Sequence, residues 1–198
     1  MPPRQKELSP TGGSLLELND LLGPPPVLEG EDSVAYQALW ARIREAVTPR
    51  DILEEIWARD IVDNLWETLR LRRIKTALLH SSAHEGLERL LTPMTEYHDR
   101  ERLVKGWASG RASAIEEVST LLTNAGLPEE SIVAETMAAK LDTLERIDNM
   151  TLKAEARRIA IFREIDRRRE VFTQRLREAA NRVEDAEFTE LPPAKAAE

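Results

Sequence analysis

Two histidines and a glutamate near the middle of the chain have a spacing that metal ligands use. His80 and His84 are four residues apart and Glu88 follows four residues later, so one continuous helix would carry all three on one face. Two serines separate the histidines at an expected helix end, and the sequence lacks the Glu-x-x-His pairs of di-metal bundles. We therefore interpret the histidines as belonging to two successive helix ends, and we predict no metal site and no cofactor.

A polar stripe recurs at intervals of three and four residues through Asp60, Asp63, Asn64 and Glu67. Paired carboxylates do acid–base chemistry only where burial or crowding moves their pKa values apart. The chain has no cysteine, and it has no Gly-rich phosphate loop, no Gly-x-Ser-x-Gly elbow and no His-Glu-x-x-His motif. We predict that the protein is not an enzyme. The stripe is either solvated or paired with arginines of the C-terminal region, and we favour the pairing.

The C-terminal region is rich in arginine. The segment from Lys153 to Arg182 contains ten basic and five acidic residues, which gives it a net charge of +5. Because the whole chain carries -8, the remaining residues carry -13. Such a face can pair with acidic parts of its own chain or of a second copy, or it can bind an anionic ligand such as the phosphates of a nucleic acid. We favour the first interpretation. The candidate interaction residues on this face are Arg157, Arg158, Arg167, Arg168 and Arg169.

The N-terminal 30 residues hold six of the eleven prolines, which predicts a disordered tail. Within it Leu15, Leu18 and Leu22 would share one side of a two-turn helix. This segment is either a peptide that docks in a partner's groove or a segment laid on the protein's own core. Residues 187–198 are predicted to be a disordered acidic tail.

One long helix is predicted over Thr48–Leu79, because Thr48 suits an N-cap, Pro49 suits the first helical position, and no Gly or Pro follows until Gly86. At 1.5 Å per residue it would be about 45 Å long. Its apolar face changes side along its length, which indicates different neighbours at different points. We expect it to be the central helix of the fold.

Shorter helices are predicted around this central one, over 33–46, 83–91, 94–108 and 111–124. Two glycines, Gly106 and Gly110, weaken the helical pattern near Trp107. The inward-facing candidates among the helices after residue 83 are Leu87, Leu90, Leu91, Leu103, Val104, Trp107, Ile115, Val118, Leu121 and Leu122.

No Gly or Pro interrupts the chain from Glu129 to Asp185, which predicts either one very long helix or two with a break near Asp148–Thr151. A coiled-coil-like 3-4 spacing runs through it, although arginine occupies four of the seam positions. The seam is formed by Leu144, Ile147, Thr151, Ala154, Arg158, Ile161, Ile165, Arg168, Phe172, Arg175, Ala179 and Arg182.

The composition, with 41% hydrophobic and 32% charged residues in 198, predicts an all-α helical bundle with a single domain over residues 31–186. No run of 18 apolar residues occurs, so no membrane span is expected, and the absence of cysteine fits a cytoplasmic protein. We predict a non-enzymatic helical protein that self-associates or docks on another protein. The alternative is a nucleic-acid-associated protein that uses the Arg-rich C-terminal helix.

Several segments together resemble an uncharacterised family of small bacterial proteins. They are Leu28–Asp32, Asp51–Lys75, Ala125–Met150, Glu155–Glu170 and Val183–Phe188. The resemblance implies a bacterial, cytoplasmic setting and one structural unit over Leu28–Phe188. It implies no activity, cofactor or catalytic residue.

Overall fold

The computed structural model describes residues 22–184, with side chains to residue 182, and this part of the chain forms helices and no strand. The all-α fold class is therefore confirmed. The helices are α2 (Ser33–Val47), α3 (Ile52–Ser81), α4 (Ala83–Leu91), α5 (Tyr97–Ala108), α6 (Ala112–Asn124), α7 (Glu130–Ala139) and α8 (Leu141–Glu184).

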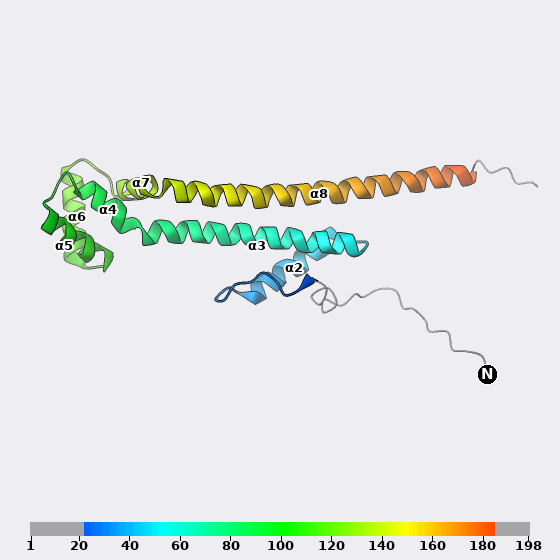
Figure 1. Ribbon diagram of the computed structural model, residues 1–198, viewed down its shortest axis with the longest axis horizontal. Helices are drawn as coiled ribbons and strands as arrows, with labels where there is room; N and C mark the ends of the chain where they lie inside the picture. The colour runs from blue at the N-terminus through cyan, green and yellow to red at the C-terminus, as the bar shows by residue number, and fades with distance from the viewer. Residues whose placement is uncertain (1–21, 185–198) are drawn as a thin grey trace, which may run out of the picture.

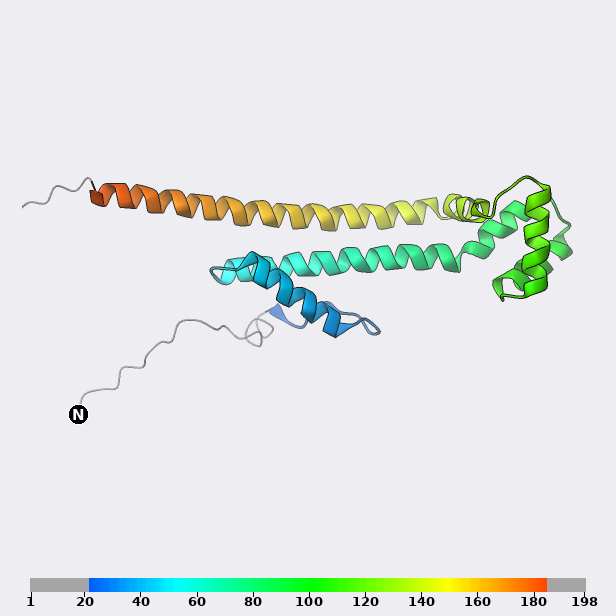
Figure 2. The ribbon, with the colours of Figure 1, turned by 180° about the vertical axis from the view of Figure 1, so that it is seen from behind.

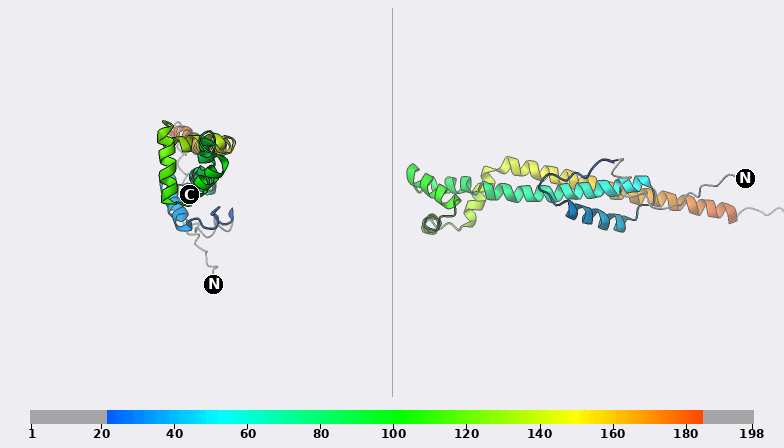
Figure 3. Two further views of the ribbon diagram at one scale, coloured as in Figure 1. Left: turned by 90° about the vertical axis from the view of Figure 1, so that its left-hand side faces the viewer. Right: turned by 90° about the horizontal axis from the view of Figure 1, so that it is seen from below.

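An antiparallel pair of long helices, α3 and α8, forms the axis of the molecule (Figure 1). Helices α4 to α7 gather at one end of this pair, and α2 packs on the opposite half of α3 (Figure 2). Two ion pairs fix the register: Lys75 with Asp148 at 2.7 Å, and Glu54 with Arg169 at 2.8 Å. Because the long pair of α3 and α8 sets its length, the molecule is a rod rather than a compact bundle (Figure 3).

Helix α8 is longer than α3. It has 44 residues, about 66 Å at 1.5 Å per residue, whereas α3 has 30. In the register set by the ion pairs, the first residue of α3, Ile52, lies level with Val171. Residues Phe172–Glu184, which we call the overhang, therefore continue beyond the start of α3 (Figure 1).

The helices enclose two separate hydrophobic cores. The corner core, where α2, the first half of α3 and α8 meet, contains the buried residues Tyr36, Trp40, Val47, Ala58, Ile61, Val62, Trp66 and Ile165. The head core, inside α4 to α7, contains the buried residues Leu87, Leu91, Leu103, Val104, Val118, Leu122 and Ile132. The predicted inward residues thus reach the head core, except Ile115, which is exposed.

Glycine decides how closely the head helices approach. A Cβ on Gly86 would lie 2.2 Å from Thr136 Oγ1 and 2.5 Å from the Ile132 carbonyl oxygen. The backbones of α4 and α7 therefore pack more closely here than any side chain would allow. A Cβ on Gly106 would lie 2.7 Å from the Ala114 methyl. Gly106 lies inside α5 and does not interrupt it. Its lack of a side chain allows α5 to pack closely against α6.

The start of the central helix differs from the prediction. Asp51, not Thr48, is the N-cap, and its carboxylate accepts hydrogen bonds from the backbone N–H groups of Leu53 and Glu54, both at 3.0 Å. Thr48 instead ends α2 in the left-handed conformation with φ 46°. Three residues therefore separate Thr48 from α3, and Pro49 is not a helical residue.

The long C-terminal segment breaks at Lys140, and the alternative break near Asp148–Thr151 is wrong. Lys140 has φ -109° and ψ 14°, outside the helical region, and its ammonium pairs with Glu85 of α4 at 2.6 Å. The turn is needed because α7 packs on α4 whereas α8 packs on α3. No local sequence signal marks it.

Candidate interaction surface

Arg169 joins three helices at the corner. Its guanidinium pairs with Glu54 of α3 at 2.8 Å and donates to the carbonyl oxygen of Val47, the last residue of α2, at 2.7 Å. Glu54 is only 2% exposed, and the hydrogen bond from Arg169 lowers the pKa of its carboxyl below the usual value. Arg169 therefore satisfies the last carbonyl group of α2 and compensates the buried charge of Glu54.

The neighbouring arginines also pair within the chain. Arg168 pairs with Asp51 at 2.7 Å, and its guanidinium lies 5.7 Å from the centre of the Trp57 ring. Arg167 donates to Glu164 on the same helix at 2.9 Å. Three of the five predicted interaction residues on α8 are thus used inside this chain, and their carboxylate partners are not those of the predicted stripe.

Arg157 and Arg158 behave differently from this group. Arg157 is exposed, and no carboxylate within residues 22–182 lies within ion-pair distance of it. Arg158 is half-buried, and its Nη1 atom is buried without a hydrogen-bond partner in the described part of the chain. Arg157 is therefore available to an outside anion, whereas Arg158 packs in the α3–α8 seam.

The acidic stripe of α3 borders the corner core through Asp63. Asp63 accepts hydrogen bonds from the Tyr36 hydroxyl and from Arg59 Nε, the latter at 3.3 Å. Burial and the neighbouring Asp63 raise the pKa of the Tyr36 hydroxyl, and the same two causes raise the pKa of the Asp60 carboxyl. Within residues 22–182 no arginine of α8 forms an ion pair with this stripe, so the predicted pairing is wrong. Arg168 and Arg169 pair with Asp51 and Glu54 instead, at the start of α3.

Glu31 attaches the N-terminal segment to α3. Its carboxylate accepts hydrogen bonds from Arg70 at 2.7 Å, from Arg73 at 2.9 Å and from Trp66 Nε1 at 2.9 Å. Hydrogen bonds from Arg70 above all, and from the Leu28 backbone N–H and Trp66, lower the pKa of Glu31 far below its usual value. The guanidinium of Arg73 also lies 5.4 Å from the centre of the Trp66 ring. The arginine cluster around Trp66 is therefore a structural attachment for residues 26–31.

The two histidines lie on different helices, so the shared face that a metal site would need does not form. His80 is near the end of α3 and His84 lies in α4, where its Nδ1 is 2.9 Å from the Ser81 carbonyl oxygen. Among residues 22–184 no group of His, Asp and Glu side chains could hold a metal ion.

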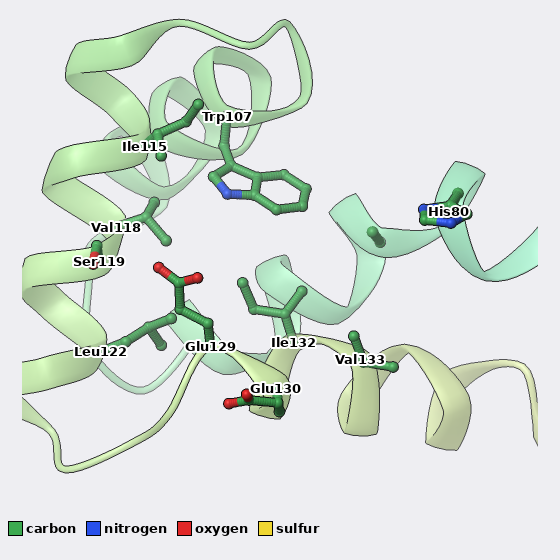
Figure 4. Close-up of a pocket in the computed structure, with 11 residues that line it drawn as sticks. His80, Trp107, Ile115, Val118, Ser119, Leu122, Glu129, Glu130, Ile132 and Val133 are labelled. Atoms are coloured by element: carbon green, nitrogen blue, oxygen red, sulfur yellow. The ribbon is translucent and has the colours of Figure 1, made fainter.

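A cleft of about 420 Å³ opens on the head. Figure 4 shows the Trp107 ring and Ile115 above it, Ile132 and Val133 of α7 below, and the carboxylate of Glu129 pointing between them. Most of the lining residues are apolar, and the polar ones are His80, Ser119, Glu129 and Glu130. Such a cleft offers packing but no converging set of donors and acceptors.

The overhang carries the largest solvent-exposed apolar side chains at the corner end of the rod. Phe172 and Leu176 are each 55% exposed, and Val171 beside them is exposed as well. Phe172 borders a recess of about 240 Å³ together with Arg168 and Arg169. Ile52 and Leu53, the first residues of α3, are also exposed here. These five exposed apolar residues all lie close to the level at which α3 begins and α8 continues alone.

The predicted leucine peptide is described only at its end. Leu22 is exposed, and Leu15 and Leu18 lie outside the described residues. The sequence pattern placed Phe172 in the seam but did not show that its side chain is exposed. Its exposure depends on where α3 begins relative to α8, which the spacing within α8 does not reveal.

A comparison with protein-family models finds no match, and comparisons with curated proteins and with solved structures find none either. The resemblance to an uncharacterised bacterial family therefore stays a prediction. No helix within residues 22–184 is long and apolar enough to cross a membrane.

Proposed function

We propose that this protein is a non-enzymatic helical interaction protein that binds through the overhang of α8 and the adjoining start of α3, in the cytoplasm. The observation that carries the proposal is the exposure of Phe172, on a seam that is buried or half-buried from Leu144 to Arg168, and of Leu176 close to it on the same helix. An apolar seam without a partner exposes surface that association would remove from water.

The polar side chains support the same proposal. The carboxylates that could have done acid–base chemistry hold helices together: Asp63 holds Tyr36, Glu54 holds Arg169, and Glu31 holds Arg70. Perturbed pKa values that arise in structural ion pairs of this kind are not by themselves a sign of catalysis.

The test compares two full-length variants with the wild type. F172R/L176R places two charges on the proposed surface, and I159R places one charge on an exposed apolar position of α8 outside it. Each variant is examined by circular dichroism, by sedimentation for self-association, and by cross-linked affinity capture from the native cell. We expect F172R/L176R to lose the association that the wild type and I159R retain. If F172R/L176R associates as the wild type does, the surface is wrongly assigned.

The alternative, a nucleic-acid-associated protein, is supported by the exposed arginines of α8. Arg157, Arg163, Arg175 and Arg177 have no carboxylate within ion-pair distance among the described residues. If all four contacted phosphates, replacing them with Gln would reduce the log–log salt slope of duplex DNA binding by roughly 3 to 4. F172R/L176R would leave that binding intact or strengthen it, which separates the two functions.

A further inference from the structure

The head of the rod is open between two of its helices. Helix α5 packs on α6 and α4 packs on α7, but within the described chain α6 and α7 do not pack against each other. The cleft of about 420 Å³ near Trp107 lies between them. Figure 4 shows Val118 of α6 and Ile132 of α7 pointing into this space from different sides. In a bundle of helices, the side chains of a further helix fill such a space.

The rim of this cleft exposes apolar side chains. Ile115 of α6 is 42% exposed, and Val133 and Met137 of α7 are 51% and 43% exposed. Val133 and Met137 are one helical turn apart, so they continue the apolar surface along α7 beyond the cleft. A small-molecule pocket encloses most of its ligand, whereas an open cleft that continues into an exposed apolar helix face fits a helix laid across it.

The charges of the cleft are acidic. Glu129 and Glu130 line it together with His80, and none of the described residues that line it is Lys or Arg. Neither carboxylate has a basic side chain within ion-pair distance among residues 22–182. The head as a whole, Ala83–Lys140, contains ten acidic and six basic residues. Unpaired carboxylates beside apolar surface favour a partner that carries positive charge.

We propose that this cleft binds an amphipathic helix of another protein, whose apolar side is flanked by lysine or arginine. The apolar residues of that helix fill the space between α6 and α7, and its basic residues lie beside Glu129 and Glu130. The cleft and the overhang lie at opposite ends of the rod (Figure 1). The proposal therefore adds a second surface and does not depend on the proposed function.

Two outlying segments of this chain have the wrong charge for the cleft. Leu15–Leu22 carries two acidic residues and no basic one, and residues 185–198 carry four acidic residues and one basic one. Either segment would bring like charges to the carboxylates of the cleft, which disfavours association. The overhang carries Arg175 and Arg177 beside its apolar residues, so a second copy in the cleft is an outcome that the test separates.

A pair of designed peptides tests the cleft. The basic peptide has about 14 residues, with leucines along one side of its helix and lysines beside them, and the acidic peptide has glutamate in place of every lysine. Binding to the full-length protein is followed through the indole N–H signals, which W107F and W57F assign. Trp107 lines the cleft, and Trp57 contacts Arg168 near the overhang. We expect the basic peptide to shift the Trp107 signal alone and to bind at least about tenfold more tightly than the acidic peptide.

Two arginine variants locate the apolar contact. I115R places a charge on a wall of the cleft, where it also repels the lysines, so it should weaken binding of the basic peptide at least about tenfold. I159R changes a similarly exposed isoleucine of α8 and should leave binding unchanged. Circular dichroism checks that both variants fold.

Two glutamine variants locate the charge contact. E129Q/E130Q removes the two carboxylates of the cleft and should weaken binding about fivefold. The matched control E88Q/E96Q removes two head carboxylates outside the cleft. Glu96, like Glu129, stands immediately before a helix and makes no side-chain cap hydrogen bond. Since its charges are not at the contact, the control should weaken binding less than about twofold.

Several results overturn the proposal: no Trp107 shift with the basic peptide up to about 1 mM, equal binding of the two peptides, or equal effects within either pair of variants. A Trp107 shift on raising the concentration of the protein alone also overturns it, because a second copy then occupies the cleft. F172R/L176R should bind the basic peptide as the wild type does, so failure of the cleft and failure of the overhang are distinguishable.

Discussion

The corner core and the head core are both helical, but different interactions hold their helices together. The corner core combines aromatic rings with buried or half-buried polar groups, among them Glu54, Glu31 and Asp63, each paired with an arginine of another turn or helix. The head core is aliphatic, and its helices approach closely because Gly86 and Gly106 have no side chain.

This difference follows from where each core lies. The corner is the place where α8 meets the end of α2 and the start of α3, from which it is far apart in sequence, beside the open end of the rod. The backbone ends there need donors and acceptors. The head consists of short helices whose core contacts are apolar, and its ion pairs, Arg102 with Glu117 and Glu85 with Lys140, lie outside that core. We therefore expect the two cores to respond differently to acid, to lost charge and to added volume.

The largest expected difference is in acid. The pKa values of Glu31 and Glu54 are lowered in the folded protein by Arg70 and Arg169, so their contribution to stability is present above about pH 4.5 and is lost as the pH falls through the folded values. Titration followed through the four indole N–H signals should show Trp40, Trp57 and Trp66 losing native shifts before Trp107, which W107F identifies. A head signal that changes first would contradict the comparison.

Removal of the corner arginine has the next largest effect. R169M leaves Glu54 buried without its cation, so we expect the free energy of unfolding to fall by about 3 kcal/mol in chemical denaturation. R167M is the matched control on the same helix. Arg167 pairs with an exposed glutamate of its own helix, so its loss should cause no resolvable change. Equal effects of the two variants would show that the ion pair between Arg169 and Glu54 does not stabilise the corner core.

Added volume tests the head. G86A introduces a methyl group that conflicts with the backbone of α7, and we expect a loss of about 2 kcal/mol in spite of the better helix propensity of alanine. The same substitution at Gly106 meets only the Ala114 methyl and should cost less. A stabilising effect of G86A would show that α4 and α7 are not in close contact.

The smallest expected effect concerns strain at the corner. Positive φ values in the head fall on glycines, Gly110 and Gly126, whereas α2 ends with Thr48 at φ 46°. A β-branched residue is unfavourable there, so T48G should raise the unfolding free energy by about 1 kcal/mol. G126T, the reverse change, should lower it. Thermal melts of both variants measure the pair, and destabilisation by T48G would show that the Thr48 side chain contributes contacts of its own.

The sequence by itself determined most of the helices. Ser33–Val47 and Ala83–Leu91 were predicted to within one residue, because caps, prolines, glycines and apolar spacing act within a few residues. The seam of α8 was predicted as far as Arg168 for the same reason. The errors at Thr48 and Lys140 arose where a tertiary contact, not the local pattern, sets the helix end.

Only the tertiary structure decided which groups meet. Arg169 and Glu54 are 115 residues apart, and several carboxylates of α3 were equally available to the arginines from sequence. The choice depends on the register between α3 and α8, which the interhelical contacts fix. The same register makes α8 extend beyond the start of α3. It therefore decides which part of the α8 seam is covered by α3 and which part remains exposed.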